Sequence, residues 1–136
     1  MLNFTDKIKQ FASKRNWQAE KMSESSCNIQ FTFSNQPFSD MLTFVRVINQ
    51  NSFIQFMLTP GAFSVSDMSR FSHDLSNMLL HRNSTSKGFW CIPEMKTPVG
   101  AKYFPSYIRI IHENSFDVNT FNEIMDDTIS EFKHLN

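Results

Sequence analysis

The chain has little glycine, and the few glycines that it contains lie far apart. Gly61, Gly88 and Gly100 are isolated among 136 residues, so neither G-x-G-x-x-G nor a glycine-rich loop ending in Lys-Ser or Lys-Thr is present. Such loops bind phosphate because clustered glycines let several backbone N–H groups approach it closely. The sequence therefore excludes the common nucleotide-binding loops.

A surplus of positive charge is also missing. Lys plus Arg and Asp plus Glu number 13 each, so the formal net charge is zero, and the longest basic cluster is Lys14-Arg15. Proteins that bind nucleic acid usually carry surplus cationic side chains, because these displace counterions from phosphates. We therefore predict no nucleic-acid partner, and a net charge near zero also tolerates a homodimer.

Cysteines and long apolar runs are scarce as well. Cys27 and Cys91 lack C-x-x-C spacing and lie in or beside apolar strand-like runs, which predicts buried free thiols. No apolar run approaches the ~20 residues that a membrane-spanning helix needs. The first residues lack the basic and apolar regions of a signal peptide. We therefore expect a cytoplasmic protein that does not insert into a membrane.

The four histidines match no pattern that is typical of metal ligands. Neither H-x-H nor H-E-x-x-H occurs in the sequence. His73 and His81 lie on one predicted helix but about 80° apart around its axis, so they could share a metal only with strain. We therefore expect no metal site.

Catalytic motifs are equally hard to find. Cys91 and His112 lie in neighbouring predicted strands and could form a thiol–imidazole pair, but Cys91 belongs to an apolar Phe-Trp-Cys-Ile run that is typical of a core. Asp126 and Asp127 are adjacent in a helical pattern and therefore point about 100° apart. We expect both on the solvated face of that helix, and we expect no enzymatic activity.

Phenylalanine and methionine are abundant instead, at 15 and 8 residues. A chain of this length has the usual size of one domain and can bury a core without metals or disulfides. The abundance indicates either compositional bias with a large core or an adaptable apolar groove, because Met is flexible and Phe offers a large area. We predict a single domain over residues 1–136.

Helical periodicity appears in three segments. In each of them, apolar residues recur every three or four positions and define one face that can be buried. Capping residues then suggest where each helix begins or ends, and Asn16 could end the first helix in a left-handed conformation. We predict helices from Thr5 to Asn16, from Ser64 or Ser66 to Asn83, and from Asp117 or Asn119 to Leu135.

Strand-like runs fill the space between the helices. The expected strands are residues 17–21, 28–33, 41–48, 53–58, 89–92 and 107–112. In the second, Ile29, Phe31 and Phe33 alternate with polar residues and share a face. The third and fourth form a hairpin and are nearly continuously apolar, so they are either covered on both faces or meet a partner on the outer face.

The order of these elements predicts the fold class. We expect an α+β fold with a single antiparallel sheet of about five strands, helices packed mainly on one face, and the order α-β-β-β-α-β-β-α. Residues 93–105 contain three prolines and a glycine, which predicts a long irregular loop or an open hairpin.

Two consecutive aromatic residues raise the question of what the sheet presents outward. Phe89 and Trp90 occupy one predicted strand, so they point to opposite faces. One of them then lies in the core. The other is either covered within the protein or exposed and used for dimerisation or peptide binding.

The second half of the chain resembles the type III secretion chaperone-like superfamily, in particular its YbjN-like and uncharacterised members. There, a central helix ends in an L-x-x-x-N pattern, a G-(F/A)-x-(I/L) strand and a second strand follow, and an acid-capped helix closes the chain. The segment from Met95 to Pro105 is longer here and contains proline. The matching residues are Leu79, Asn83, Gly88, Phe89, Ile92, Tyr107–Ile111 and Asp117–Phe121.

The resemblance implies a non-enzymatic protein without a cofactor, often a homodimer. Secretion chaperones of this fold hold an extended segment of a client protein against apolar patches, and YbjN-like relatives are tied to regulation of stress or motility. We therefore expect a chaperone-like or regulatory domain that holds an apolar segment of a partner protein. The expected contact residues are Phe31, Phe33, Phe44 and Phe53.

An alternative is a small-molecule-binding α+β domain with a cavity between the sheet and its helices. The aromatic-rich interior motivates it, together with Cys91 and His112.

Overall fold

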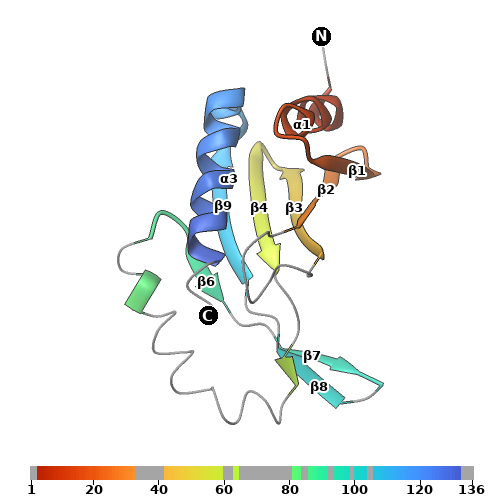
Figure 1. The fold of residues 1–136 in the computed structure, drawn as a ribbon, viewed down its shortest axis with the longest axis vertical. Coiled ribbons are helices and arrows are strands. Elements are labelled where there is room, and N and C mark those ends of the chain that lie inside the picture. Colours follow the sequence, from red (N-terminus) through yellow and green to blue (C-terminus); the bar gives the residue numbers. More distant parts are fainter. Residues whose placement is uncertain are drawn as a thin grey trace.

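Two antiparallel sheets and several helical segments make up the parts of the chain that the computed structural model describes (Figure 1). The main sheet has the strand order β1-β2-β3-β4-β9-β6, and the small one β5-β8-β7. The predicted α+β class is confirmed, although the main sheet has six strands rather than about five. The described residues are 3–32, 42–59, 63–64, 81–83, 86–91, 94–98, 100–103 and 106–132.

Consecutive hairpins build the first part of the main sheet, and β9 then lies between β4 and β6. The strands of the main sheet are β1 (Gln18–Ser23), β2 (Ser26–Thr32), β3 (Leu42–Gln50), β4 (Phe53–Thr59), β6 (Phe89–Cys91) and β9 (Ser106–His112). The small sheet consists of β5 (Phe63–Ser64), β7 (Glu94–Thr97) and β8 (Gly100–Tyr103). For residues 93–105 the sequence predicted a long irregular loop or an open hairpin, and β7 and β8 pair as a hairpin.

The helices are α1 (Phe4–Ser13) and α3 (Val118–Phe132), with a short 3₁₀ turn, η1 (Glu113–Ser115), before α3. Residues 81–83 are also helical, and most of the helix predicted to end at Asn83 lies outside the described residues. Asp117 caps α3 as predicted, because its Oδ1 accepts a hydrogen bond from the Thr120 N–H at 2.7 Å.

The cap of α1 differs from the prediction. Asn3, not Thr5, is the N-cap, and its Oδ1 accepts a hydrogen bond from the Asp6 N–H at 2.9 Å. Asn caps at least as well as Thr, and the earlier start brings Phe4 onto the buried face of the helix. After the helix, Asn16 adopts the predicted left-handed conformation, with φ 61°.

The turn between β3 and β4 is also shorter than predicted. Asn51 and Ser52, with φ 54° and 67°, form a two-residue connection, and β3 continues through Gln50. Two successive residues with positive φ give a turn whose twist matches that of the flanking strands. The turn fixes the register in which Gln50 faces Phe53.

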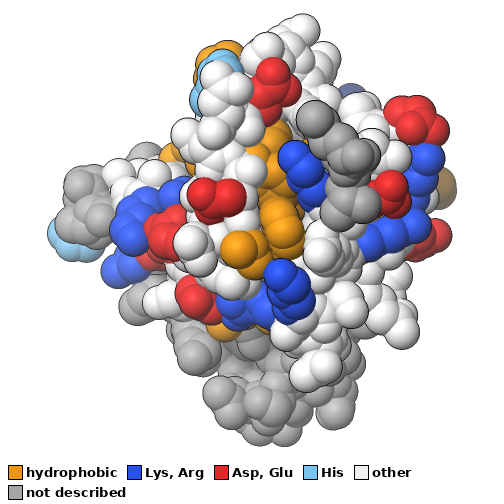
Figure 2. All heavy atoms as spheres, turned by 90° about the horizontal axis from the view of Figure 1, so that it is seen from above, with side chains coloured by type: hydrophobic (Ala, Val, Ile, Leu, Met, Phe, Trp, Pro, Cys, Tyr) orange, Lys and Arg blue, Asp and Glu red, His pale blue; other side chains and the backbone are white. Residues whose placement is uncertain are grey.

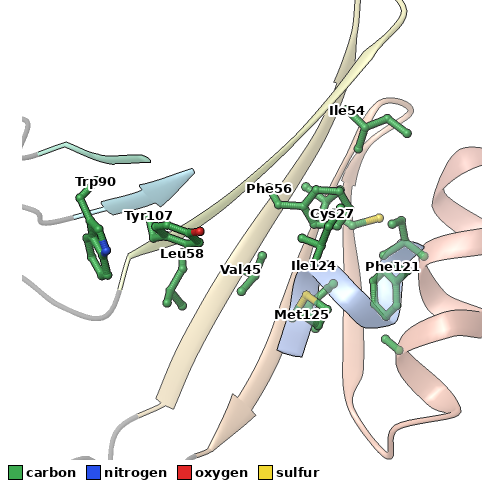
Figure 3. Packing of buried hydrophobic residues seen from close by; sticks show 14 residues of the cluster. Cys27, Val45, Ile54, Phe56, Leu58, Trp90, Tyr107, Phe121, Ile124 and Met125 are labelled. Atoms are coloured by element: carbon green, nitrogen blue, oxygen red, sulfur yellow. The ribbon is translucent and has the colours of Figure 1, made fainter. Parts of the chain in front are cut away.

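The hydrophobic core lies between one face of the main sheet and the two helices (Figure 3). Alternate residues of β2, β3 and β4 meet α1 and α3, and these side chains have almost no exposed surface. Burial of each large apolar side chain stabilises the fold by about 1.5–3 kcal/mol. The core residues of this contact are Ile8, Ala12, Cys27, Ile29, Val45, Val47, Ile54, Phe56, Leu58, Phe121, Ile124 and Met125.

Aromatic rings close the seam between α1 and α3. The Phe116 ring lies 5.9 Å from that of Phe4 and 5.4 Å from that of Phe11, and Phe11 lies 5.6 Å from Phe121. Such tilted and edge-on contacts add to the area that the rings bury. Seen from the end where α1 lies, hydrophobic side chains gather between charged ones of both signs (Figure 2). The rings of Phe4, Phe11 and Phe116 are partly buried and pack against the fully buried core, to which Phe121 belongs.

Candidate functional site

An apolar stripe lies on the face of the main sheet opposite α1 and α3. It consists of Phe53 on β4, Ile110 on β9 and Phe89 on β6, whose side chains are 51%, 50% and 44% exposed. Only Met22, on β1, joins them among the exposed large hydrophobic residues of the described part of the chain. Three of these four residues therefore share one face, on three adjacent strands.

Alternation along each strand explains why these side chains are exposed. Ile54 follows Phe53 and is buried under the helices, and Trp90 follows Phe89 and is buried as well. The prediction that Phe89 and Trp90 point to opposite faces, with one in the core, is confirmed. Within the described part of the chain, no helix covers the face that Phe53 and Phe89 share.

The strand register makes the stripe a straight diagonal. Phe53 faces His112 across the sheet, and Ile110 lies two residues earlier on β9. Phe89 faces Ile108, again two residues earlier. Diagonal neighbours in a sheet are about 7–8 Å apart. The stripe therefore spans roughly 15 Å across β4, β9 and β6.

A groove of about 420 Å³ opens at the Phe53 end of the stripe. Its volume lies within the range of small binding pockets, which is roughly 300–1,000 Å³. The side chains that line it are all uncharged: Ile48, Gln50, Asn51, Phe53, Gln55 and Ile110. The groove is therefore suited to an apolar side chain rather than to an ion.

The other half of this face is polar. Glu20, Asn28 and Arg46 stand in one row across β1, β2 and β3. The Arg46 Nε donates a hydrogen bond to the Asn28 Oδ1 at 3.4 Å. This face is thus polar along the row of Glu20, Asn28 and Arg46, whereas its half-exposed large apolar side chains lie on β4, β9 and β6.

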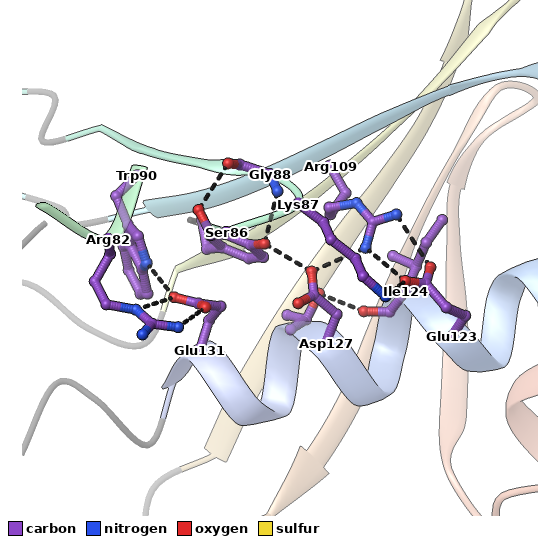
Figure 4. A network of polar contacts seen from close by, with 12 residues as sticks. Arg82, Ser86, Lys87, Gly88, Trp90, Arg109, Glu123, Ile124, Asp127 and Glu131 are labelled. Atoms are coloured by element: carbon purple, nitrogen blue, oxygen red, sulfur yellow. Dashed lines mark hydrogen bonds and ion pairs between the residues drawn. The ribbon is translucent and has the colours of Figure 1, made fainter. Parts of the chain in front are cut away.

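A network of polar contacts lies on the covered side, between α3 and the strands β6 and β9 (Figure 4). Glu131 is almost fully buried, forms an ion pair with Arg82 and accepts a hydrogen bond from the Trp90 Nε1 at 3.0 Å. The hydrogen bond with Glu131 raises the pKa of Arg82. The charge of Glu131 is therefore compensated where water is excluded.

Tyr107 is the centre of a second group of contacts in this network. Its hydroxyl donates to the Asp127 Oδ2 at 2.6 Å and accepts from the Gly88 N–H at 2.8 Å. Arg109 binds Asp127 at 2.9 Å and Glu123 at 3.0 Å. Burial raises the pKa of Tyr107 far above its usual range, and the hydrogen bond to Asp127 adds to this. These groups fasten α3 to the sheet.

The network corrects one prediction from the sequence. Asp126 is exposed and pairs with Arg15 at 2.6 Å, but Asp127 is largely covered and does not lie on the solvated face. A signal was available in the sequence: Glu123, Asp127 and Glu131 recur every four residues and therefore share one side of the helix. Their cationic partners come from distant parts of the chain.

Of the predicted contact residues, only Phe53 belongs to the stripe. The backbones of Phe31 and Phe44 lie on neighbouring strands, where Phe31 pairs with Thr43 and Phe44 with Gln30. Phe33 lies outside the described residues. Sequence reasoning did not select Ile110, because its proximity to Phe53 depends on which strand neighbours β4.

The thiol–imidazole pair considered from the sequence does not form. Cys91 faces Ser106 at one end of β9, whereas His112 lies at the other end. Six residues of strand separate the two ends, which is about 20 Å. Burial raises the pKa of both Cys27 and Cys91, which disfavours their reactive thiolate form. Cys27 is buried as predicted, but Cys91 only in part.

The described residues hold neither a metal-ligand cluster nor a membrane-spanning helix, and the chain matches no known protein in the comparisons. Among the residues that the structure describes between 3 and 132, no three His, Cys, Asp or Glu side chains lie close enough together to hold a metal ion. In the same ranges, no helix is long and apolar enough to cross a membrane. No family model matches the chain, and comparisons with curated proteins and with solved structures also gave no match.

Proposed function

We propose that this protein is a non-enzymatic protein-binding domain whose apolar stripe holds a short apolar segment of a partner protein. One observation carries the proposal: three half-exposed large hydrophobic side chains, Phe53, Ile110 and Phe89, lie on one face of adjacent strands. Single exposed apolar side chains are common on protein surfaces. Contiguous ones are typical of interaction sites.

The chemistry of the surroundings defines the segment. The groove beside Phe53 is lined by apolar and amide side chains alone. The nearest charged residue in the rows of paired residues that cross the stripe is Arg46, on β3. A charged partner side chain placed there would lose water without gaining an opposite charge. The contacting part of the partner is therefore apolar and uncharged.

The size of the stripe favours a short segment over a second copy of the chain. A buried Phe contributes roughly 150–250 Å², so three half-exposed side chains offer about 300 Å². A stable dimer needs about 800 Å² from each partner. We also propose the homodimer expected from the sequence, but its interface needs more surface than the stripe offers. In addition, we propose a cytoplasmic location and a chaperone-like or regulatory role.

The small-molecule alternative has less support. This alternative requires a cavity between the sheet and the helices, but side chains there, such as Val47, Phe56 and Ile124, are fully packed. The groove lined by Phe53 and Ile110 opens on the other face. A shallow groove flanked by exposed apolar side chains fits a polypeptide segment better than an enclosed ligand.

Site-specific photo-cross-linking in cells tests the proposal. A photoreactive phenylalanine analogue replaces Phe53, Ile110 or, as a matched control, Arg46, which is exposed on the same face but in its polar half. We expect one partner protein to be cross-linked from positions 53 and 110 and not from position 46. Mass spectrometry of the product should map the cross-link to an apolar, uncharged segment.

Two results would contradict the proposal. Products that contain only this chain would assign the stripe to self-association or to coverage by another part of the same chain. Equal products from all three positions would show that Phe53 and Ile110 attract no partner beyond what any exposed position on this face does.

A further inference from the structure

The outer strand β6 covers only part of its neighbour β9. β6 pairs with β9 from Ser106 to Ile108, whereas β9 continues to His112. On its other side, β9 is paired with β4 as far as His112. Within the described part of the chain, Arg109–His112 therefore have a neighbouring strand on one side only. We refer to the β6 side of these four residues as the β9 edge.

The residues that lead into β6 explain why its pairing stops there. The Gly88 N–H donates to the Tyr107 hydroxyl at 2.8 Å, and the Lys87 Nζ pairs with Glu123 on α3 at 2.8 Å. Both contacts draw the chain to the helix-covered side of the sheet (Figure 4). A Cβ at Gly88 would collide with the Ile108 carbonyl oxygen, so glycine permits this close approach. The chain thus reaches β6 from the helix side and does not pair with the β9 edge.

The backbone groups at the β9 edge can be assigned from the contacts of β6. The Asn83 side chain accepts a hydrogen bond from the Trp90 N–H at 2.7 Å and donates one to the Trp90 carbonyl at 3.2 Å, on the outer side of β6. Because these groups alternate in direction along a strand, those of Phe89 point toward β9, where Phe89 faces Ile108. The groups of Ile108 therefore point toward β6. Two residues later, the N–H and C=O of Ile110 point to the β9 edge.

A contact at the far end of β9 agrees with this assignment. The Glu113 N–H donates to the Ser52 carbonyl at 2.9 Å, in the turn that leads into β4. The groups of Ile111, two residues earlier, then also point to β4, whereas the N–H groups of Ile110 and His112 point to the β9 edge. Within the described residues, no strand pairs with these outward groups.

The β9 edge differs from the other edge of the main sheet, which is the outer side of β1. β1 carries the exposed charges Glu20 and Lys21, and its register with β2 shifts beyond Lys21. Exposed charges and irregular pairing are features by which edge strands avoid further pairing. The β9 edge is regular and borders the half-exposed Ile110 and Phe89, while two ion pairs hold the Arg109 side chain toward α3. It is therefore suited to strand addition.

We propose that the partner segment is extended and adds a short strand at the β9 edge, in line with β6, an inference that rests on the proposed protein-binding function. Its backbone exchanges hydrogen bonds with the N–H and C=O of Ile110 and accepts one from the His112 N–H. Residues in one row of a sheet share a face, so the residue beside Ile110 points to the open face. There its side chain covers the space between Ile110 and Phe89.

The surroundings of the β9 edge define the length and pattern of the segment. Four residues of β9 correspond to about 13 Å, so about four residues of the segment can pair. Side chains on the open face meet Ile110 and Phe89 and are apolar, whereas those on the other face approach the ion pair of Arg109 and Glu123 and are polar. A second copy would need about 800 Å², far more than this short edge and the stripe provide. The occupant is therefore a short segment in which apolar and polar residues alternate.

Hydrogen exchange of the full wild-type chain, measured residue by residue by NMR, tests whether the β9 edge is open. We expect the Ile111 N–H, which points to β4, to exchange at least tenfold more slowly than the N–H groups of Ile110 and His112. Similar protection of all three groups would mean that another part of this chain or a second copy already covers the edge. That result would overturn the proposal.

Binding of an alternating peptide tests the added strand. The probe is a fluorescein-labelled peptide in which valines alternate with threonines between terminal lysines, and fluorescence anisotropy measures its dissociation constant. His112 has φ −74°, which proline adopts, so His112→Pro removes the outward N–H without strain in the backbone. His112→Ala is the matched control, because it loses the same side chain and keeps the N–H. We expect His112→Pro to bind the peptide about fivefold more weakly than His112→Ala.

The bound peptide should also slow exchange of the wild-type Ile110 N–H at least tenfold and leave that of Ile111 unchanged, a measurement that needs no variant. Circular dichroism verifies the folding of the two His112 variants. Equal affinities of these variants, unchanged exchange at Ile110, or absence of peptide binding would each overturn the strand addition.

The failure of this inference can be distinguished from failure of the proposed function. Cross-linking from position 53 in cells tests that function without reference to the conformation of the segment. A partner that is cross-linked equally well in His112→Pro and His112→Ala would support the protein-binding function and exclude backbone pairing at the β9 edge. Absence of any cross-linked partner would contradict both.

Discussion

The two faces of the main sheet are built from similar residues but have opposite surroundings. β4 contributes a phenylalanine to each: Phe56 is 1% exposed beneath the helices, whereas Phe53 is 51% exposed on the open face. Alternation along one strand places them on opposite sides. The comparison shows that the strand determines only that the two rings are separated, whereas the packing of α1 and α3 determines which of them stabilises the fold.

The difference also bears on function. Full burial of a large apolar side chain stabilises a protein by about 1.5–3 kcal/mol, and half-exposed residues such as Phe53 and Phe89 forgo much of this. Three such residues in one stripe are more than the scattered exposure that any surface shows. We therefore attribute stability to the covered face and assign the proposed binding function to the open one.

The largest expected effect is the difference in stability loss between variants of the two phenylalanines of β4, Phe56 and Phe53. Phe56→Ala should lower the free energy of unfolding by about 3–5 kcal/mol, because it leaves a cavity in a closely packed core. Phe53→Ala should lower it by less than about 1 kcal/mol. Urea unfolding followed by circular dichroism measures both values. Similar losses in the two variants would mean that Phe53 is also covered in solution.

The next effect compares two acids of α3. Glu131→Gln removes the charge that compensates Arg82 inside the protein, and we expect a loss of about 2–3 kcal/mol, reduced from the value for a fully buried pair because Arg82 is partly exposed. Glu123→Gln, with a side chain that is 39% exposed, should lose less than about 1 kcal/mol. A small effect of Glu131→Gln in thermal or urea unfolding would contradict the role assigned to its burial.

A smaller effect concerns the Tyr107 hydroxyl. Tyr107→Phe removes its hydrogen bonds to Asp127 and Gly88, and we expect a loss of about 1–2 kcal/mol at neutral pH. Because the folded protein holds the hydroxyl proton more tightly than the unfolded chain, the stabilisation is complete below pH ~10 and is lost as the pH rises above it.

The same variant therefore has a second measurable property. The decline in stability above pH ~10 should be less steep for Tyr107→Phe than for the wild-type protein, as followed by urea unfolding at a series of alkaline pH values. Identical slopes would show that Tyr107 titrates in the folded protein as it does in the unfolded chain.

The smallest expected effect lies at the start of α3. The hydrogen bond from the Thr120 backbone N–H lowers the pKa of Asp117. A lowered pKa contributes stability that is present above the pKa of the unfolded chain and is lost as the pH falls through the folded value. Asp117→Asn keeps a good cap, so stability at pH 7 should change little, while the decline below pH ~4 becomes shallower. An unchanged acid decline would contradict this assignment.

Much of the fold was predictable because its signals are local. The alternation of Ile29 with polar neighbours, the left-handed Asn16 and the cap at Asp117 each depend on a few adjacent residues, and the structure confirms them. The errors were local choices between similar residues. Asn3 replaces Thr5 as the cap of α1, and the β3–β4 turn falls at Asn51 and Ser52.

The candidate site was predictable only in part. The sequence indicated that Phe53 was a contact residue and that Phe89 or Trp90 faced away from the core. It could not bring Ile110 next to Phe53, because that contact requires β9, more than 40 residues later in the sequence, to pair with β4. The same register separates Cys91 from His112, which had looked like neighbours from strand order alone.

By itself, the sequence determined which residues share a face, because side chains alternate along a strand and repeat every three to four residues along a helix. It did not determine which face of the sheet the helices cover. β3 and β4 carry apolar residues on both faces, for example Val47 beside Ile48 and Phe56 beside Met57. Only the tertiary structure decided this, because α1 and α3 bury their own apolar faces against one side and leave Phe53, Ile110 and Phe89 on the other.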